Sequence, residues 1–277
     1  MKKLLLFLGV FIVSFSGIMI KVSDSNPISI SFYRCLIASF LYITALKWKF
    51  KLFDFKKEIL LLISGTFVAL HFYFWISSFR HTTIAGAVIP LMVQPFFTSL
   101  LSFLIYNEKV SLKEIFSTLT ILLGVIIMTT FDAKISLELS FGDVLSLIGT
   151  LFLCGFITVG RFIIPIIGTL NFNMRSYLIA SAFLFFLSYQ EIFRFFPIKE
   201  WVIFWGLGGG CSFLGYTLIN NSLKFFKAGT VSIALVGEPV LSIVWAWILF
   251  GEIPTFSQII GLLTSILGII SFFRSKL

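Results

Sequence analysis

The sequence predicts an all-α integral membrane protein with ten transmembrane helices, arranged as two inverted five-helix repeats. Three observations predict this fold: the composition, ten apolar segments of membrane-spanning length, and a repeat of the residues that punctuate the helices. Of the 277 residues, 58% are hydrophobic and only 12% are charged. A soluble domain carries roughly 25% charged residues, so most of this surface is expected to face lipid.

Each apolar segment is long enough to cross a bilayer, which takes about 20 residues. The segments span roughly 4–22, 28–46, 59–79, 82–106, 112–131, 142–164, 174–193, 201–220, 229–250 and 255–273. The links are short, so consecutive helices must run antiparallel. The longest link, Asp132 to Phe141, divides the chain into two predicted repeats, residues 1–133 and 140–277. The start of the chain resembles a signal peptide, but no clean cleavage site follows, and we expect the first segment to be retained.

The repeat appears when the sequence is shifted by 144 positions, which lays residues 78–128 on residues 222–272 without a gap. The residues that coincide are Pro95 and Pro239, Glu108 and Glu252, and Gly124 and Gly268. Two predicted capping boxes, 111–114 and 255–258, also fall in register. Because each repeat holds five helices, the second copy crosses the membrane in the opposite orientation, as in many secondary transporters.

Lysine and arginine residues are distributed unevenly between the predicted loops. One side would hold 14 of them: Lys2, Lys3, Lys47, Lys49, Lys51, Lys56, Lys57, Lys109, Lys113, Arg175, Lys224, Lys227, Arg274 and Lys276. The other side would hold four: Arg80, Lys134, Arg194 and Lys199. By the positive-inside rule, both termini are expected in the cytoplasm. This bias accounts for the net charge of +9, so we expect membrane lipids as partners and no nucleic acid.

The sequence offers little for catalysis or metal binding. Cys35, Cys154 and Cys211 fall inside apolar runs without metal-ligand spacing, which predicts buried free thiols. The nucleophile motif Gly-x-Ser-x-Gly and the zinc motif His-Glu-x-x-His do not occur. We therefore expect no enzymatic activity, no metal and no cofactor.

Several of these residues resemble the repeat of the drug/metabolite transporter superfamily, EamA type. The matching residues are Pro95, Glu108 and Gly124 in the first copy and Glu238, Pro239, Glu252 and Gly268 in the second, with Lys21 and Arg34 in the first two helices. One departure is the Ser-Phe-Ser-Gly of residues 14–17, where the family often has Trp-Gly. The resemblance implies movement of small organic solutes, often outward, through a central cavity lined by helices 1, 3, 4, 6, 8 and 9.

Seven residues are predicted to line that cavity: His71, Trp75, Ser78, Gln94, Tyr216, Asn220 and Glu238. Glu238 is the strongest candidate, because an ionisable residue in the bilayer costs about 2.5–3.5 kcal/mol and tends to be functional. It precedes Pro239, where a helix break exposes backbone groups, and its repeat partner is the uncharged Gln94 before Pro95. Glu238 would bind an amine or carry a proton; the alternative is a structural, protonated carboxyl. For the other polar residues the alternative is hydrogen bonding between helices.

Five residues are candidates for gate contacts or for contacts with an anionic group of the solute: Lys21, Arg34, Glu108, Arg161 and Glu252. For the bases the alternative is snorkelling to lipid headgroups, and for the acids it is an interaction with a helix dipole. A salt bridge of Lys21 with Asp24 or Glu252 is one predicted gate. The glycine-rich segment 206–210 predicts close helix packing or flexing.

Together these features predict a secondary active transporter that exports amino acids or related amphiphilic metabolites by alternating access. The expected membrane is the plasma membrane of a bacterium or archaeon, and protons are the candidate coupling ion. The alternatives are a carrier or flippase for lipid-linked sugars or nucleotide sugars, and a non-transporting receptor or assembly factor. The fifth and tenth helices are apolar enough to pack against lipid or against a second copy in a homodimer.

Overall fold

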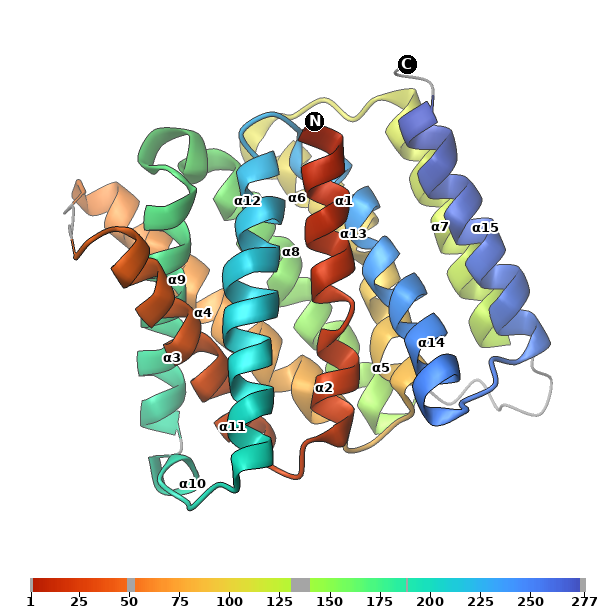
Figure 1. The fold of residues 1–277 in the computed structure, drawn as a ribbon. Coiled ribbons are helices and arrows are strands. Elements are labelled where there is room, and N and C mark those ends of the chain that lie inside the picture. The colour runs from red at the N-terminus through yellow and green to blue at the C-terminus, as the bar shows by residue number, and fades with distance from the viewer. Residues whose placement is uncertain (1, 49–52, 131–139, 188, 275–277) are drawn as a thin grey trace.

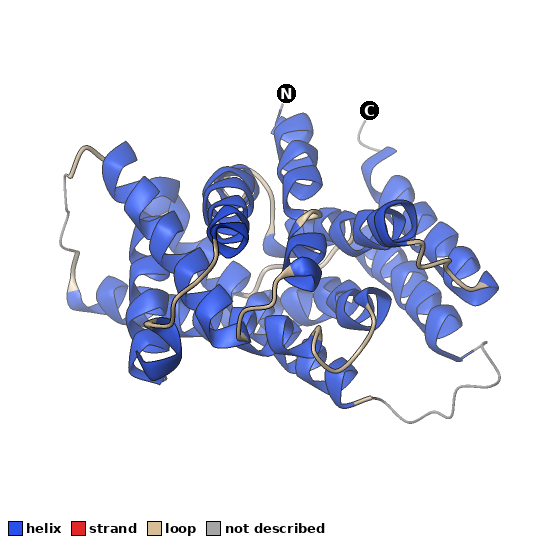
Figure 2. Ribbon diagram, turned by 60° about the horizontal axis from the view of Figure 1, so that its bottom comes forward, coloured by secondary structure: helices blue, strands red, loops and turns tan. Residues whose placement is uncertain are grey.

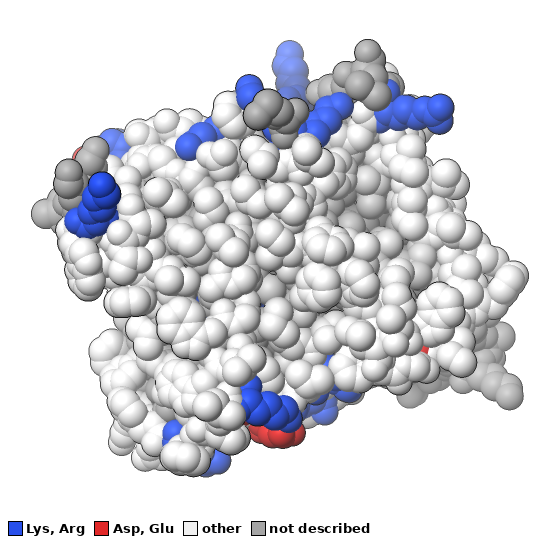
Figure 3. Space-filling view, viewed as in Figure 1, with Lys and Arg blue, Asp and Glu red and all other residues white. Residues whose placement is uncertain are grey.

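The computed structural model describes residues 2–48, 53–130, 140–187 and 189–274, and every regular element within these ranges is helical (Figures 1 and 2). Ten helical spans in the described ranges are long and apolar enough to cross a membrane. This confirms the predicted all-α membrane fold. Both chain ends lie at one face of the bundle (Figure 1), which we name the termini face; the other end is the opposite face. Charged side chains gather at these two faces, with an uncharged band between them (Figure 3).

The first five spans run from residue 2 to residue 130. They are α1 (Lys2–Val13) with α2 (Ser16–Val22), α3 (Pro27–Ala45), α4 (Phe55–Ser78), α5 (Ile84–Val88) with the 3₁₀ helix η1 (Ile89–Val93) and α6 (Gln94–Tyr106), and α7 (Leu112–Thr130). The first span differs from the predicted continuous helix, because it breaks at Ser14 and Phe15. The fourth span tightens over η1, between Pro90 and Pro95, where prolines remove backbone donors.

The second five spans follow the same order. They are α8 (Phe141–Ile167), α9 (Thr169–Leu187) followed by the short α10 (Tyr189–Ile192), α11 (Ile198–Trp205) with the π-helix η2 (Gly206–Gly215) and α12 (Tyr216–Ser222), α13 (Ala228–Leu235) with α14 (Gly237–Phe250), and α15 (Phe256–Arg274). The ninth span breaks at Val236, because Pro239 has no N–H to donate to the Leu235 carbonyl. The linker between the halves, with Lys134, lies outside the described residues, as do Lys49, Lys51 and Lys276.

The glycines of η2 differ in their surroundings. A Cβ on Gly208 would strike Ile37 and the Arg34 carbonyl of α3, so this glycine permits the close approach of the two helices. Gly210 has open space around it. The predicted close packing is therefore confirmed at Gly208 and not at Gly210.

Both halves end their fourth helix with the same backbone motif. Asn107 and Gly251, which are 144 positions apart, both adopt left-handed backbone with φ of 51° and 66°. Their N–H groups donate at 3.0 Å to the carbonyls of Phe103 and Trp247. The two predicted capping boxes also form, Ser111 with Glu114 and Thr255 with Gln258. The residues that repeat in the sequence are thus the residues that end or cap the helices in both halves.

Helices α7 and α15 pack against each other at one edge of the bundle (Figure 1). The repeat-matched glycines lie in this contact, where a Cβ on Gly124 would strike the Gly261 carbonyl and one on Gly268 would strike the Ser117 carbonyl. Ser117 Oγ donates to the Gly268 carbonyl at 2.5 Å. The fifth and tenth helices are therefore each other's main partners, and their remaining apolar faces point outward.

Candidate functional site

Arg34 of α3 is a buried cation inside the membrane-spanning bundle. Its side chain is 1% exposed, and its guanidinium lies 4.0 Å from the centre of the Phe72 ring. Its Nε donates to Ser212 Oγ at 2.8 Å, while its Nη1 has no hydrogen-bond partner in the protein. Arg34 therefore does not snorkel to the headgroups, because its charge is enclosed by protein on all sides.

Glu238 of α14 is the buried anion of the same region, at 6% exposure. It accepts a hydrogen bond from Ser16 Oγ at 3.3 Å, at the break between α1 and α2. The same break is bound to α14 a second time, since Trp245 Nε1 donates to Ser14 Oγ at 2.9 Å. The break in the first span, which was not predicted, therefore binds α14, the helix that follows the break in the ninth span.

Arg34 contacts η2 through Ser212, Glu238 contacts α2 through Ser16, and α2 packs against η2, so the two charges lie on neighbouring elements. Among the described residues, however, neither one forms an ion pair. Charges buried in protein are normally paired directly, because an unpaired buried charge is costly. Two opposite charges that share an interior without touching are therefore well placed to receive a ligand that carries both signs.

An aromatic column stands beside Arg34. The ring of Phe72 stacks at 6.3 Å on Tyr177, which stacks at 5.9 Å on Tyr42. Asn173 Nδ2 donates to the Tyr42 hydroxyl at 2.8 Å, and Asn220 Nδ2 donates to Asn173 Oδ1 at 2.7 Å. The Tyr177 hydroxyl and Asn220 Oδ1 have no protein partner. With Arg34 Nη1, this column presents three unused polar atoms in the interior.

The predicted cavity residues of α4 are already engaged with the protein. Nδ1 of His71 lies 2.9 Å from the Gly149 carbonyl of α8, and Trp75 Nε1 donates to the Ala87 carbonyl of α5 at 3.1 Å. Ser78 Oγ donates to the carbonyl of Trp75 within its own helix, at 2.6 Å. This geometry favours the interhelical role for His71 and Trp75 over contact with a solute.

The two remaining cavity candidates, Gln94 and Tyr216, are both 2% exposed. Gln94 opens α6, with Pro95 in the same turn, and its Nε2 has no protein partner. Tyr216 lies one turn before Asn220 and meets the Phe156 ring edge-on at 6.4 Å. All seven predicted cavity residues are therefore buried, and only some of them have unused polar atoms.

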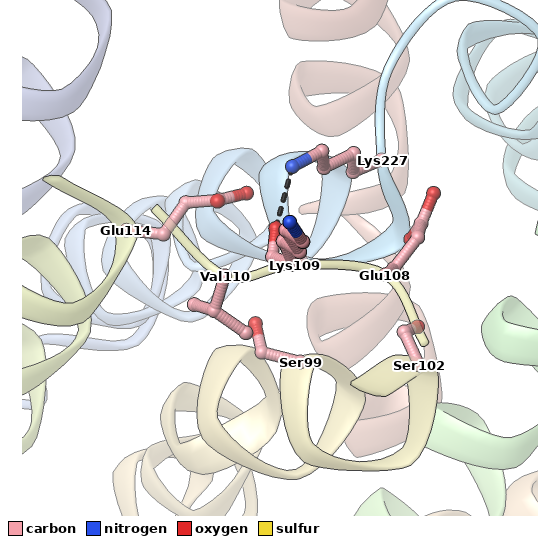
Figure 4. Close-up of a pocket in the computed structure, with 8 residues that line it drawn as sticks. Ser99, Ser102, Glu108, Lys109, Val110, Glu114 and Lys227 are labelled. Carbon is pink, nitrogen blue, oxygen red and sulfur yellow. Dashed lines mark hydrogen bonds between the residues drawn. The ribbon is translucent and has the colours of Figure 1, made fainter. Parts of the chain in front are cut away.

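An ion pair closes the termini face. Arg161 Nε donates to Glu108 Oε1 at 2.9 Å, and Arg161 Nη1 donates to the Leu223 carbonyl at 2.8 Å. The pair joins the end of the fourth span, in the first half, to α8 and α12 of the second half. Beside it Lys227 Nζ donates to the Lys109 carbonyl at 2.6 Å, over a small polar pocket (Figure 4). Two of the five predicted gate residues are thus brought together.

A loop closes the opposite face, and sequence reasoning missed its partners. Residues 23–25, which we name the latch loop, are held by Glu200 of α11, at 1% exposure. The hydroxyls of Ser23 and Ser25 and the N–H of Asp24 all donate to this carboxylate, the last at 3.0 Å. Arg80 Nη2 donates to the carbonyls of Ser23 and Ser25 at 2.9 and 2.5 Å. This closure also joins the first half to the second.

The structure does not form the predicted contacts of Lys21. The Lys21 side chain is exposed and makes no ion pair with any described residue. Asp24 pairs instead with Lys199 at 2.7 Å, and this hydrogen bond lowers the pKa of the exposed Asp24 carboxyl. Glu252 also lacks an ion pair in the described part of the chain. The acid of Glu200 was visible in the sequence, but no local signal showed that a loop 175 residues away folds onto it.

Comparison with known proteins agrees with this architecture. The family model of the EamA-like transporter family matches residues 2–130 and 140–274. The chain is 22% identical to the uncharacterized transporter YdfC of Bacillus subtilis, over 95% of this chain and 87% of that protein. It is 23% identical to mouse solute carrier family 35 member G1, over 92% and 73%. A crystal structure shares the fold with a TM-score of 0.79 at 14% identity, over 99% and 96% of the two chains. The chain therefore belongs to the EamA-like transporter family and is a multi-pass membrane transporter.

Proposed function

We propose that the protein exports small amphiphilic metabolites that carry both charges, such as amino acids, by alternating access. The observation that carries this proposal is the burial of Arg34 and Glu238 on neighbouring elements, where neither forms an ion pair with any described residue. Arg34 Nη1 and the Tyr177 hydroxyl offer donors to a carboxylate. Glu238 and Asn220 Oδ1 offer acceptors to an ammonium group. A zwitterion would therefore satisfy both charges at once.

The two closures support the alternating-access part of the proposal. The ion pair of Glu108 with Arg161 and the latch loop stand at opposite faces, and each joins the two halves. If the halves rock about the central site, one closure opens while the other holds. The excess of lysine and arginine supports a cytoplasmic termini face, so export would run from the termini face to the opposite face. The membrane we propose is the plasma membrane of a bacterium or archaeon.

Counterflow in proteoliposomes tests the choice of solute. The panel compares amino acids with the matching amines that lack the carboxyl and the matching acids that lack the amine. We expect exchange of the zwitterions, and in Arg34→Gln a loss of at least about tenfold in their apparent affinity, the scale of one charged hydrogen bond. Lys56→Gln, which removes an exposed cation that makes no ion pair with any described residue, is the control and should behave as the parent. Equal exchange of amine, acid and zwitterion, or no exchange across the panel, would contradict the proposal.

We propose that Glu238 couples transport to protons, because its buried carboxyl lies at the helix break. We expect Glu238→Gln to lose uptake driven by a pH gradient while counterflow without a gradient persists at reduced affinity, since the amide keeps an oxygen acceptor for the ammonium group but has no charge and cannot carry the proton. The measurement is uptake with and without an imposed pH step. An unchanged response of Glu238→Gln to the pH step would rule out this coupling role.

A further inference from the structure

Buried polar atoms without a protein partner mark a second feature of the bundle. Eight such side-chain atoms occur in the described residues, and three of them belong to the central site. The other five are Gln94 Nε2, Thr98 Oγ1, Ser99 Oγ and Ser102 Oγ of α6, and Ser232 Oγ of α13. Four of these five residues are at most 2% exposed. We name these five residues the polar seam.

The polar seam follows one side of α6. Gln94, Thr98 and Ser102 are spaced by four residues, which places them on neighbouring turns of the same helix face. Helix α13 lies close to this face, because a Cβ on Gly229 would strike Ser99. Ser99 and Ser102 also line the small pocket at the termini face, next to Glu108 (Figure 4). The seam therefore runs from this pocket towards Gln94, in the middle of the fourth span.

The repeat-matched seam in the other half has a different chemistry. Thr98 corresponds to Ser242, which is buried to the same degree, at 1% against 0% exposure. Ser242 Oγ, however, donates to the Ser14 carbonyl at 3.0 Å. Ser102 corresponds to Ala246, and Ser232 corresponds to Val88, and neither of these has a polar side chain. At positions 98, 102 and 232 one seam thus has unused hydrogen-bonding groups that its counterpart lacks, while Gln94 is matched by Glu238, which accepts a hydrogen bond from Ser16.

We propose that the polar seam binds a file of water molecules between the termini face and the middle of the bundle, while the matching seam between α14 and α5 stays dry. Hydroxyl and amide groups buried at membrane depth need partners, and the bilayer supplies none. Neighbouring side chains on successive turns stand about 5–6 Å apart, which one water with hydrogen bonds to both can bridge. The central region is then hydrated from the termini face alone while both closures are shut.

Single-cysteine substitutions at repeat-matched positions test this proposal. Thr98→Cys and Ser242→Cys are each placed in a Cys154→Ala background, because the Cys154 thiol lies beside Thr98 and would pair with a new thiol there. The buried thiols of Cys35 and Cys211 set the background. The protein is held in lipid nanodiscs, which leave both faces open to a small, water-soluble methanethiosulfonate reagent. We expect Thr98→Cys to react at least about tenfold faster, because thiol modification requires access of reagent and water.

A second matched pair, Ser102→Cys and Ala246→Cys, repeats the comparison if Thr98→Cys does not fold. Thr158→Cys is the control for burial alone, since Thr158 is 1% exposed and its hydroxyl donates to the Cys154 carbonyl. Equal rates within the pairs, or faster reaction at position 242 or 246, would overturn the proposal. The labelling requires no transport. Faster labelling at the polar seam in a protein that shows no counterflow would therefore count against the proposed function alone.

Discussion

The two ends of the bundle are closed by different chemistry, although the two halves share one backbone plan. At the termini face the closure is an ion pair between Glu108 and Arg161, whose side chains are 19% and 27% exposed. At the opposite face Glu200 and Arg80 hold the latch loop through five hydrogen bonds. The repeat matches Glu108 to Glu252, but Glu252 makes no ion pair with any described residue.

This difference separates what the repeat determines from what the side chains determine. The repeat places a matched acid, Glu108 or Glu252, after the fourth helix of each half, but the latch loop and Glu200 are not part of the repeated helix ends. The side chains set the strength of each closure: a partly exposed ion pair is worth about 0–1 kcal/mol, whereas each buried donor that loses its acceptor costs about 1–3 kcal/mol. We therefore expect the termini face, where the polar seam begins, to open more easily than the opposite face.

The largest effect is expected from Glu200→Ala. This change leaves the hydroxyls of Ser23 and Ser25 and the Asp24 N–H without their acceptor, so the free energy of unfolding should fall by about 2–4 kcal/mol. Unfolding in detergent, followed by helical circular dichroism, measures the loss. Glu200→Gln keeps one oxygen acceptor and should show a smaller loss.

The control for Glu200→Ala is Glu191→Gln, which removes a carboxylate that pairs with the exposed Arg194 on the same face. It should change the free energy of unfolding by no more than about 0.5 kcal/mol. If the two variants lose the same stability, the latch loop is no stronger than a surface ion pair, and the two closures are alike.

A smaller effect is expected at the termini face. A double-mutant cycle of Glu108→Gln and Arg161→Gln should give a coupling of about 0.5–1 kcal/mol, because both side chains are partly exposed. The coupling should weaken at high salt, since partly exposed charges are screened. Unfolding free energies of the parent, the two single variants and the double variant give the coupling. A value equal to the loss in Glu200→Ala would contradict the ranking of the two closures.

Much of the fold was predictable because its signals are local. Span length and the prolines are read within one segment, and Pro239 removes a backbone donor wherever it stands. The break at Ser14 and the π-helix η2 were not predicted, because no residue in either segment forbids an α-helix. They depend on contacts from distant elements, such as that of Trp245 with Ser14.

The site was predictable where one residue is unusual by itself. Glu238 stands out as an acid in an apolar run, and its burial follows from that position. Arg34 lies near the start of its span, where the sequence allows either snorkelling to the headgroups or burial in the bundle. Only its contacts with Phe72 and Ser212 show that the side chain is buried. Glu200 was missed because an acid in the first turn of a helix is ordinary. Its contact with the latch loop is set by the tertiary fold.

The smallest effect is expected from Lys21→Gln and Glu252→Gln, which remove the two residues of the predicted gate between Lys21 and Glu252. Neither residue has an ionic partner among the described residues, so each change should alter the free energy of unfolding by no more than about 0.5 kcal/mol. The double variant should show no coupling beyond the error of the unfolding measurement. A coupling as large as that of Glu108 with Arg161 would mean that Lys21 and Glu252 form an ion pair in the membrane. The two closures would then differ only by the latch loop added to one of them.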